Sequence, residues 1–233
     1  MKRKRKSLSK RKVDKLLAIG KVACGLFTRN GYFETSLEDI AAEADISKGA
    51  LYHYFPSKTA LLYFILKRFG DRLLEDLEQE LERIEDGFAK IRFIVYRHID
   101  LSVQFRDEAK ALINAKYSLL PKYLKVVTGQ EKKYYEIVTR VVSDLLGDRV
   151  NEGELTALTF SLFGMCNWIY TWYNPKGSVS PEQLSEIIFG TFTKGVSRYL
   201  SGNQGQGRPA DPNAPVTHTG RKDQKEEAKK HKR

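Results

Sequence analysis

Residues 31–62, GYFETSLEDIAAEADISKGALYHYFPSKTALL, decide the fold of this chain. Two short helical patterns follow one another within them. The first starts after Thr35, where Glu38 completes an S/T-x-x-E capping box and the apolar positions then recur at helical spacing. The second starts at Ser47 and ends before Pro56, which cannot continue a helix. Two short helices joined by a tight turn predict a helix-turn-helix unit.

The second of these helices, SKGALYHYF at 47–55, has an unusual composition for a helix. At about 100° per residue it divides into two flanks. One flank carries a cation, flat rings and hydrogen-bond donors, and a glycine there lets another surface approach the backbone. Ser47 adds a hydroxyl and free N–H groups that suit a phosphate. This is the chemistry of a helix in the major groove of DNA. The polar flank holds Lys48, Gly49, Tyr52 and His53, and the inward flank holds Ala50, Leu51, Tyr54 and Phe55.

The run at 31–62 resembles the TetR family of bacterial transcription regulators. The shared elements are an aromatic residue after the glycine, Thr/Ser before the first helix, and the strings DIA, SKG, LYHYF and SK..L. The resemblance covers the first quarter of the chain. It implies an all-α homodimer whose amino-terminal helices bind half of a near-palindromic operator. It also implies a carboxy-terminal domain that dimerises and holds a small ligand whose binding releases DNA.

The same resemblance implies roles for single residues, and for each of them the alternative is an ordinary solvated or core side chain. Thr35 and Ser36 match phosphate contacts, as does Tyr54, and Lys58 matches a lysine that grips the DNA backbone. Ser47 keeps the phosphate role argued above. The positions matched to groove-facing residues are Lys48, Gly49, Ala50, Tyr52 and His53.

Outward from this unit, the apolar spacing is helical almost throughout, and no convincing strand pattern appears. A first helix ends at Gly31, and further helices are expected at 58–84, 88–106, 121–146, after Asn151, and at 181–200. The fold class is therefore all-α. The expected divisions are a disordered basic arm (1–12), a helix-turn-helix domain (13–60), a helical ligand-binding and dimerisation domain (61–200), and a disordered basic tail (201–233).

The positive charge lies in the two ends of the chain. The formal net charge is +11, yet residues 13–200 have 24 basic and 25 acidic side chains. Residues 1–12 hold eight Lys/Arg and no acid. A basic arm of this kind usually attaches to a polyanion, and solubility alone is the alternative. We therefore expect the arm to supply most of the long-range attraction to DNA.

The two cysteines, Cys24 and Cys166, are far apart and form no C-x-x-C pair, which fits a reducing cytoplasm and predicts no metal site. Residues 155–175 lack any formal charge and are long enough to span a membrane. Because Thr, Ser and Asn dilute this stretch, we expect a buried helix instead. With 181–200 it would form a four-helix bundle between two subunits.

The second domain is rich in aromatic residues, which either line a ligand pocket or form plain core. Residues 164–184, GMCNWIYTWYNPKGSVSPEQL, resemble TetR regulators of lipid and steroid breakdown, which commonly respond to acyl-CoA thioesters. The resemblance implies a repressor released by a small apolar ligand, with an acyl-CoA as the leading candidate. No catalytic motif or cofactor motif is apparent, and a non-specific architectural DNA-binding protein is the alternative. The expected pocket residues are Phe93, Tyr96, Tyr117, Tyr123, Phe163 and Trp168.

Overall fold

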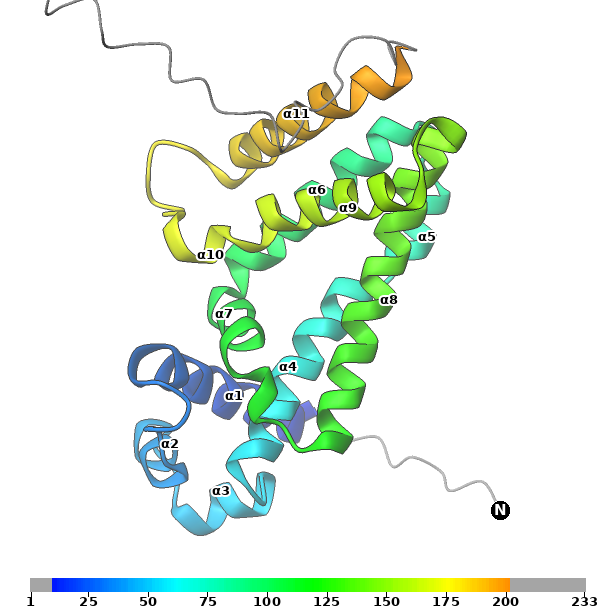
Figure 1. The fold of residues 1–233 in the computed structure, drawn as a ribbon. Helices are drawn as coiled ribbons and strands as arrows, with labels where there is room; N and C mark the ends of the chain where they lie inside the picture. Colours follow the sequence, from blue (N-terminus) through cyan, green and yellow to red (C-terminus); the bar gives the residue numbers. More distant parts are fainter. Residues whose placement is uncertain (1–9, 202–233) are drawn as a thin grey trace, which may run out of the picture.

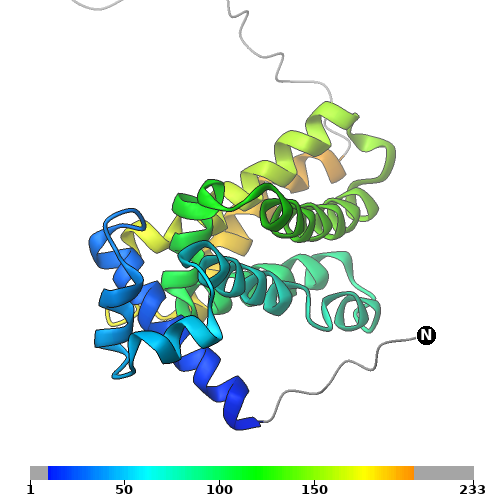
Figure 2. The same cartoon turned by 90° about the horizontal axis from the view of Figure 1, so that it is seen from below.

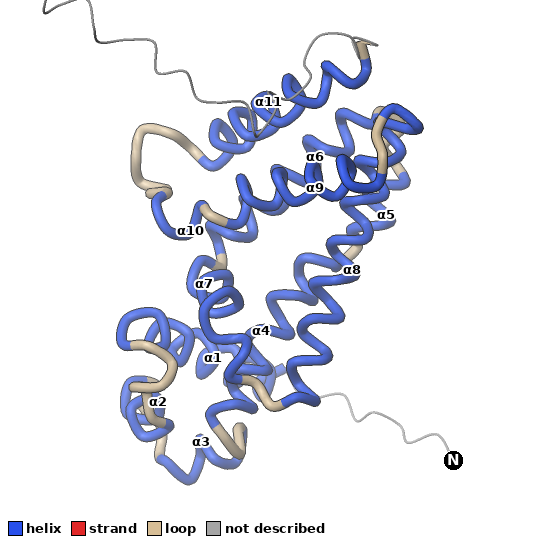
Figure 3. The backbone as a smooth tube through the Cα atoms, viewed as in Figure 1, coloured by secondary structure: helices blue, strands red, loops and turns tan. Residues whose placement is uncertain are grey.

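The computed structural model describes residues 10–201, and within them it is all-α, with no strand (Figures 1 and 3). Three helices form the amino-terminal domain at one end of the molecule, and the remaining helices form the second domain (Figures 1 and 2). The predicted fold class is confirmed. The first three helices are α1 (Lys10–Asn30), α2 (Leu37–Glu43) and α3 (Lys48–Tyr54).

Helix α1 begins earlier than the sequence suggested. It starts at Lys10, so Lys10, Arg11 and Lys12 are helical, and the expected disordered arm at 1–12 is wrong for its last three residues. These residues continue the helix because nothing in KRK breaks one and Lys and Arg are good helix formers. The rest of the arm and nearly all of the tail at 201–233 lie outside the described residues.

The cap of α2 is one residue later than predicted. Ser36 is the N-cap, and its hydroxyl accepts a hydrogen bond from the Asp39 N–H at 3.0 Å. The Asp39 carboxylate in turn accepts one from the Ser36 N–H. Thr35 is instead buried and donates to the Gly31 carbonyl at 2.8 Å. Gly31 takes a φ of 98°, a left-handed conformation that favours glycine and ends α1.

The helix expected at 58–84 is divided. Helix α4 (Lys58–Leu74) ends where Asp76 adopts a φ of 53°, and the short α5 (Leu77–Glu82) follows. The apolar stripe stays buried through Leu73 before this break and through Leu77 and Leu81 after it, so periodicity alone could not reveal the break. The helix expected at 88–106 ends at Gln104, and after a bend at Phe105 a further helix begins that was not expected. These two helices are α6 (Gly87–Gln104) and α7 (Arg106–Ala115), and a 3₁₀ turn, η1 (Lys116–Ser118), comes next.

The remaining helices begin and end close to the predicted residues. Helix α8 (Pro121–Leu146) has proline in its first turn and stops at Gly147. Asn151 and Glu154 form the predicted capping box at the start of α9 (Glu152–Asn167). The charge-free stretch bends after Asn167, so α10 (Ile169–Trp172) is a separate turn. The other elements are η2 (Gly147–Arg149) and α11 (Pro181–Leu200). No helix of residues 10–201 is long and apolar enough to cross a membrane.

Two apolar cores share α4. Leu61, Leu62, Ile65 and Leu66 of α4 belong to the core beneath α1, α2 and α3. One turn further along α4, Phe69 and Leu73 belong to the larger core of α6, α8, α9 and α11. Helix α4 also packs along α8 (Figure 2). A rigid helix buried in both cores links the two domains mechanically.

Candidate nucleic-acid interface and ligand pocket

The two flanks of α3 differ as predicted. Lys48, Gly49, Tyr52 and His53 are exposed, and the Tyr52 side chain is 42% exposed. Leu51 and Phe55 on the opposite flank are buried, and Ala50 and Tyr54 are half-buried. A Cβ built on Gly49 meets nothing within 4 Å, so the backbone there is open to a docking surface. DNA contact by these groups remains a prediction.

Hydrogen bonds and an ion pair hold the start of α3. The Ser47 hydroxyl accepts from the Ala50 N–H at 3.2 Å, which leaves its own proton free to donate. Lys48 forms an exposed ion pair with Glu38 of α2, and its ammonium lies 5.9 Å from the centre of the Tyr52 ring. The hydrogen bond from Lys48 lowers the pKa of Glu38. The cation of the α3 flank is therefore already partly neutralised.

The start of α1 lies beside the exposed polar flank of α3, which consists of Lys48, Gly49, Tyr52 and His53 and is called the recognition flank below. Arg11, Lys12 and Lys15, together with one acidic residue, Asp14, border the same surface hollow as His53 and Tyr54. Three basic side chains next to a ring and a hydroxyl make a continuous surface that suits a phosphate backbone. The resemblance did not point to these residues, although the charge run at 10–15 was visible in the sequence.

Two predicted phosphate contacts are corrected by the structure. Thr35 is 1% exposed and its hydroxyl is bonded within the domain, so its side chain cannot reach a phosphate. The Lys58 ammonium donates to the carbonyls of Tyr32 (2.7 Å), Phe33 (3.2 Å) and Thr35 itself (2.9 Å). An ammonium has three donors, and all three are used here. Lys58 therefore fastens the loop before α2 to the start of α4. Ser36 is half-buried and stays a candidate contact.

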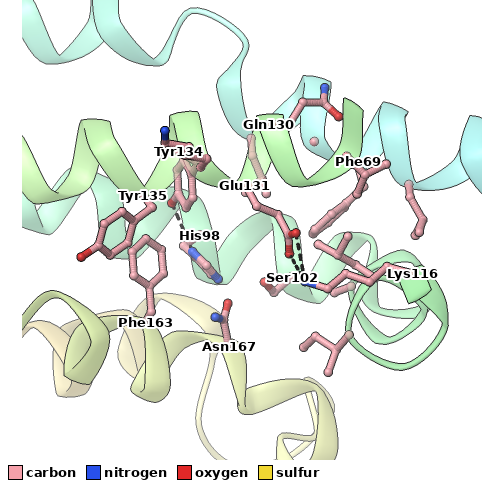
Figure 4. A pocket seen from close by; sticks show the side chains of 18 of the residues that line it. Phe69, His98, Ser102, Lys116, Gln130, Glu131, Tyr134, Tyr135, Phe163 and Asn167 are labelled. Atoms are coloured by element: carbon pink, nitrogen blue, oxygen red, sulfur yellow. Dashed lines mark hydrogen bonds and ion pairs between the residues drawn. The ribbon is translucent and has the colours of Figure 1, made fainter. Parts of the chain in front are cut away.

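A pocket of about 370 Å³ lies in the second domain between α4, α6, α7, α8 and α9 (Figure 4). One wall is apolar: Phe69 and Leu73 come from α4, and Phe160 and Phe163 come from α9. Its size is within the usual range for small-molecule sites, and such sites are mostly apolar with a few polar groups. The helix that links the two domains thus forms part of the pocket wall.

One end of the pocket holds a buried polar pair. The His98 Nδ1 and the Tyr134 hydroxyl lie 3.1 Å apart and share a hydrogen bond (Figure 4). Burial lowers the pKa of His98 to about 4, against the smaller opposing effect of a hydrogen bond with Asn167. Burial also raises the pKa of Tyr134. Both groups are therefore neutral at pH 7 and can serve as hydrogen-bonding partners for a carbonyl or hydroxyl group.

A charged pair lies at the other end. The Lys116 ammonium of η1 donates to both carboxylate oxygens of Glu131 of α8, at 2.7 and 2.9 Å (Figure 4). The Lys116 side chain is only 17% exposed. A half-buried ion pair is costly to break unless a new partner replaces the old one. A charged ligand group would therefore have to replace either Lys116 or Glu131 as the partner of the other.

Of the six expected lining residues, only Phe163 lines this pocket. Phe93 packs on the core, and Tyr96, Tyr117 and Trp168 are exposed. Tyr123 stacks on Tyr63, with ring centres 4.2 Å apart. The polar lining residues were missed. The sequence could have indicated His98 as a pocket residue, because this histidine interrupts a mostly apolar face of α6. The lining residues that carry polar groups are His98, Ser102, Lys116, Gln130, Glu131, Lys132, Tyr134, Tyr135, Asn167 and Tyr170.

Within residues 10–201, no group of three or more His, Cys, Asp or Glu side chains is arranged to hold a metal ion. Cys24 and Cys166 are free and buried. Burial raises the pKa of both thiols.

Comparison with known proteins identifies the family. Residues 19–63 match the model of bacterial regulatory proteins of the tetR family, and residues 85–196 match the tetracyclin repressor-like C-terminal domain. The chain is similar to a TetR-family transcriptional regulator from Bordetella parapertussis, at 31% identity and a TM-score of 0.73 over 79% of this chain and 95% of that one. This chain belongs to the TetR family of transcriptional regulators.

Two further relatives have more specific descriptions. The transcriptional repressor KstR2 of Mycolicibacterium smegmatis is 27% identical over 199 residues, which are 79% of this chain and 90% of that protein. A crystal structure of AibR in complex with isovaleryl coenzyme A and operator DNA has a TM-score of 0.67 at 25% identity, over 76% of this chain and 97% of that one. The matched proteins are transcriptional regulators rather than enzymes, so the prediction of a non-enzyme is confirmed.

Proposed function

We propose that this protein is a transcriptional repressor that binds a near-palindromic operator as a homodimer and leaves it when a small, largely apolar ligand binds. The observation that carries this proposal is the exposed flank of α3, which offers Lys48, Gly49, Tyr52 and His53 beside the basic start of α1. Such a flank suits base edges, and the basic residues suit phosphates. Because operator DNA lies in the bacterial cytoplasm, the protein would act there.

An apolar face on α9, α10 and α11 supports the dimer. Phe160, Trp168, Trp172 and Ile187 are each more than half exposed. A Cβ built on Gly164 meets nothing within 4 Å, so a second helix could approach closely there. Exposed large apolar side chains on neighbouring helices are typical of a subunit interface. Two copies of α9 and α11 would form the four-helix bundle expected from the sequence.

We propose an acyl-CoA as the ligand, supported by the likeness to AibR, whose structure holds isovaleryl coenzyme A. The apolar wall of the pocket suits an acyl group, and the His98–Tyr134 pair suits a carbonyl. A cavity of about 370 Å³ takes an acyl group, whereas the nucleotide half of a coenzyme A would extend out of it. Exposed lysines on α8, Lys122 and Lys125, could meet its phosphates.

Helix α4 would couple the ligand to DNA. Its middle lines the pocket through Leu66, Phe69 and Leu73, and its first residue, Lys58, holds the loop that precedes α2. A ligand that tilts α4 would therefore move the helix-turn-helix unit. In a dimer this changes the separation of the two recognition helices from the ~34–36 Å that adjacent major grooves require.

The test compares the promoter region of the protein's own gene with random DNA of equal length at fixed salt. A repressor with an operator should prefer the promoter by at least ~1,000-fold, and an architectural protein would show almost no preference. The second step adds isovaleryl-CoA, longer acyl-CoAs and the free acids to the operator complex. Release by an acyl-CoA that Phe163→Trp abolishes and Tyr96→Trp leaves intact would support the pocket. Release by none of the acyl-CoAs would refute the proposed ligand class without refuting operator binding.

A further inference from the structure

A second cavity lies across α4 from the ligand pocket, at the junction of the two domains. Its volume is about 420 Å³. It is lined by Lys21 of α1, by Arg68 and Arg72 of α4, and by the corner between α6 and α7. The pocket described above is lined instead by residues such as Leu66 and Leu73, on the opposite side of α4. One helix therefore separates an apolar cavity from this junction cavity.

The lining of the junction cavity is strongly charged. Four basic side chains face two acidic ones, Asp107 and Glu108 of α7, which leaves a formal excess of two positive charges. Arg68 and Arg72 lie one turn apart on α4, where like charges repel. Burial and the neighbouring Arg68 charge lower the pKa of Arg72. An isolated cluster of this kind destabilises the fold unless an anion compensates it.

The chain offers these arginines little compensation of its own. Within residues 10–201, Lys21, Arg68 and Arg72 form no ion pair with a carboxylate. Arg72 stacks on the ring of Phe105, 3.8 Å from its centre, which holds the guanidinium in place. Arg106 donates two N–H groups to the Tyr170 carbonyl and keeps others free. The guanidinium groups of Arg72 and Arg106 are therefore held in place, and some of their N–H groups can donate to a ligand.

We propose that the junction cavity binds a small phosphorylated metabolite, with Arg68 and Arg72 as the principal contacts and Lys21 as a third. A guanidinium donates two parallel hydrogen bonds to a phosphate, and two guanidiniums one turn apart can share one phosphate group. The two negative charges of a phosphate monoester match the excess of two positive charges. The cavity also has room for a sugar-sized remainder beside Phe64. This site is separate from the acyl-ligand pocket.

The consequence of such binding follows from the place of the cavity. Lys21 belongs to the DNA-binding domain, whereas Asp107, Glu108 and Arg106 belong to the ligand-binding domain. A ligand that contacts α1, α4 and α7 together would favour one relative position of the two domains. By linkage, it would change the affinity for both the operator and the ligand in the pocket.

The test uses the full chain in the absence of DNA. The probe is glucose 6-phosphate, a phosphate monoester, titrated calorimetrically at constant ionic strength. Saturable binding with a stoichiometry of one per subunit is expected. The double variant Arg68→Gln/Arg72→Gln should bind at least about tenfold more weakly, because each lost guanidinium removes charge-assisted hydrogen bonds. The control Lys176→Gln/Lys194→Gln makes the same change in net charge at two exposed positions with no assigned role, and should bind as the unchanged protein does.

Should the glutamine variant fail to fold, Arg68→Lys/Arg72→Lys keeps both charges and loses only the forked geometry, and it should still bind several-fold more weakly. Three outcomes would overturn the proposal. They are a titration no different from sodium chloride of equal ionic strength, equal affinity in the arginine variants, and loss of binding on neutralising Lys10 and Lys12 instead. Because no operator is present, none of these results depends on the proposed repressor function.

Discussion

The recognition flank of α3 and the ligand pocket are built in opposite ways. The flank comes from a single helix, Lys48–Tyr54, and its polar groups are exposed. The pocket is assembled from six α-helices and the 3₁₀ turn η1, and its key polar groups, His98 and Tyr134, are buried. An exposed side chain contributes to binding and little to folding, whereas a buried one contributes to both. Changes in the flank should therefore alter DNA binding alone, and changes in the pocket should also alter stability.

The sharpest test of this contrast removes both rings from the flank. Tyr52→Ala/His53→Ala should weaken operator binding by about 2–6 kcal/mol, since each lost base contact costs about 1–3 kcal/mol. The melting temperature should change little, because both side chains are exposed. Fluorescence anisotropy and thermal unfolding measure the two effects. Tyr96→Ala, on an exposed ring of α6, is the control and should change neither. Unchanged operator choice in the double variant would contradict the assignment of the flank.

Lys58, the first residue of α4, is an exception to this contrast, because its ammonium stabilises the loop before α2 although we expected it to contact DNA. Lys58→Met leaves three carbonyls without their ammonium, and we expect a loss of about 2 kcal/mol in unfolding free energy. Operator binding should fall as well, since the loop before α2 is released. Urea unfolding measures the first effect. Lys67→Met, on the same helix with only an exposed ion pair to Asp71, should have almost none. Weaker DNA binding at full stability would instead indicate a direct phosphate contact.

The pocket should impose a pH dependence on folding. The pKa of His98 is about 4 in the folded protein, whereas an unperturbed histidine of the unfolded chain has a pKa of 6.5. The unfolded chain therefore binds the proton first as the pH falls. Stability is therefore complete above pH 6.5 and is lost progressively toward pH 4, with about 2 kcal/mol lost between pH 7 and 5. His98→Gln should remove this part of the slope in urea unfolding, and His53→Gln should retain it. Identical slopes in all three proteins would mean that His98 is accessible to protons.

The smallest effect concerns Glu38, which partly neutralises Lys48 on the flank. Glu38→Gln frees the ammonium and removes a negative charge near DNA, so operator affinity should rise a few-fold at low salt and less at high salt. Glu43→Gln removes the same charge from α2 but releases Arg29 rather than Lys48, and should have the weaker effect. An equal gain in both variants would show that general charge, not the release of Lys48, is responsible.

The predictions from sequence succeeded where a single helix decides the outcome. The exposed flank of α3, the start of α8 at Pro121 and the capping box of Asn151 and Glu154 each depend on neighbours within one or two turns. They failed where distant segments meet. The break at Asp76 is invisible to periodicity because the stripe stays buried across it. The Lys58 ammonium, expected to contact DNA, donates instead to the carbonyl of Tyr32, 26 positions earlier in the chain.

Side-chain periodicity and capping residues by themselves determined the helical class and the face that we assign to DNA, because these are local properties of a helix. The family came from the resemblance carried by residues 31–62. Only the tertiary structure decided which side chains converge on a cavity. Five of the six aromatic residues expected in the pocket lie elsewhere, while Lys116 and Glu131, fifteen positions apart, form an ion pair inside it. A cavity is the space left where several helices pack, so its lining depends on their relative positions and not on any one pattern.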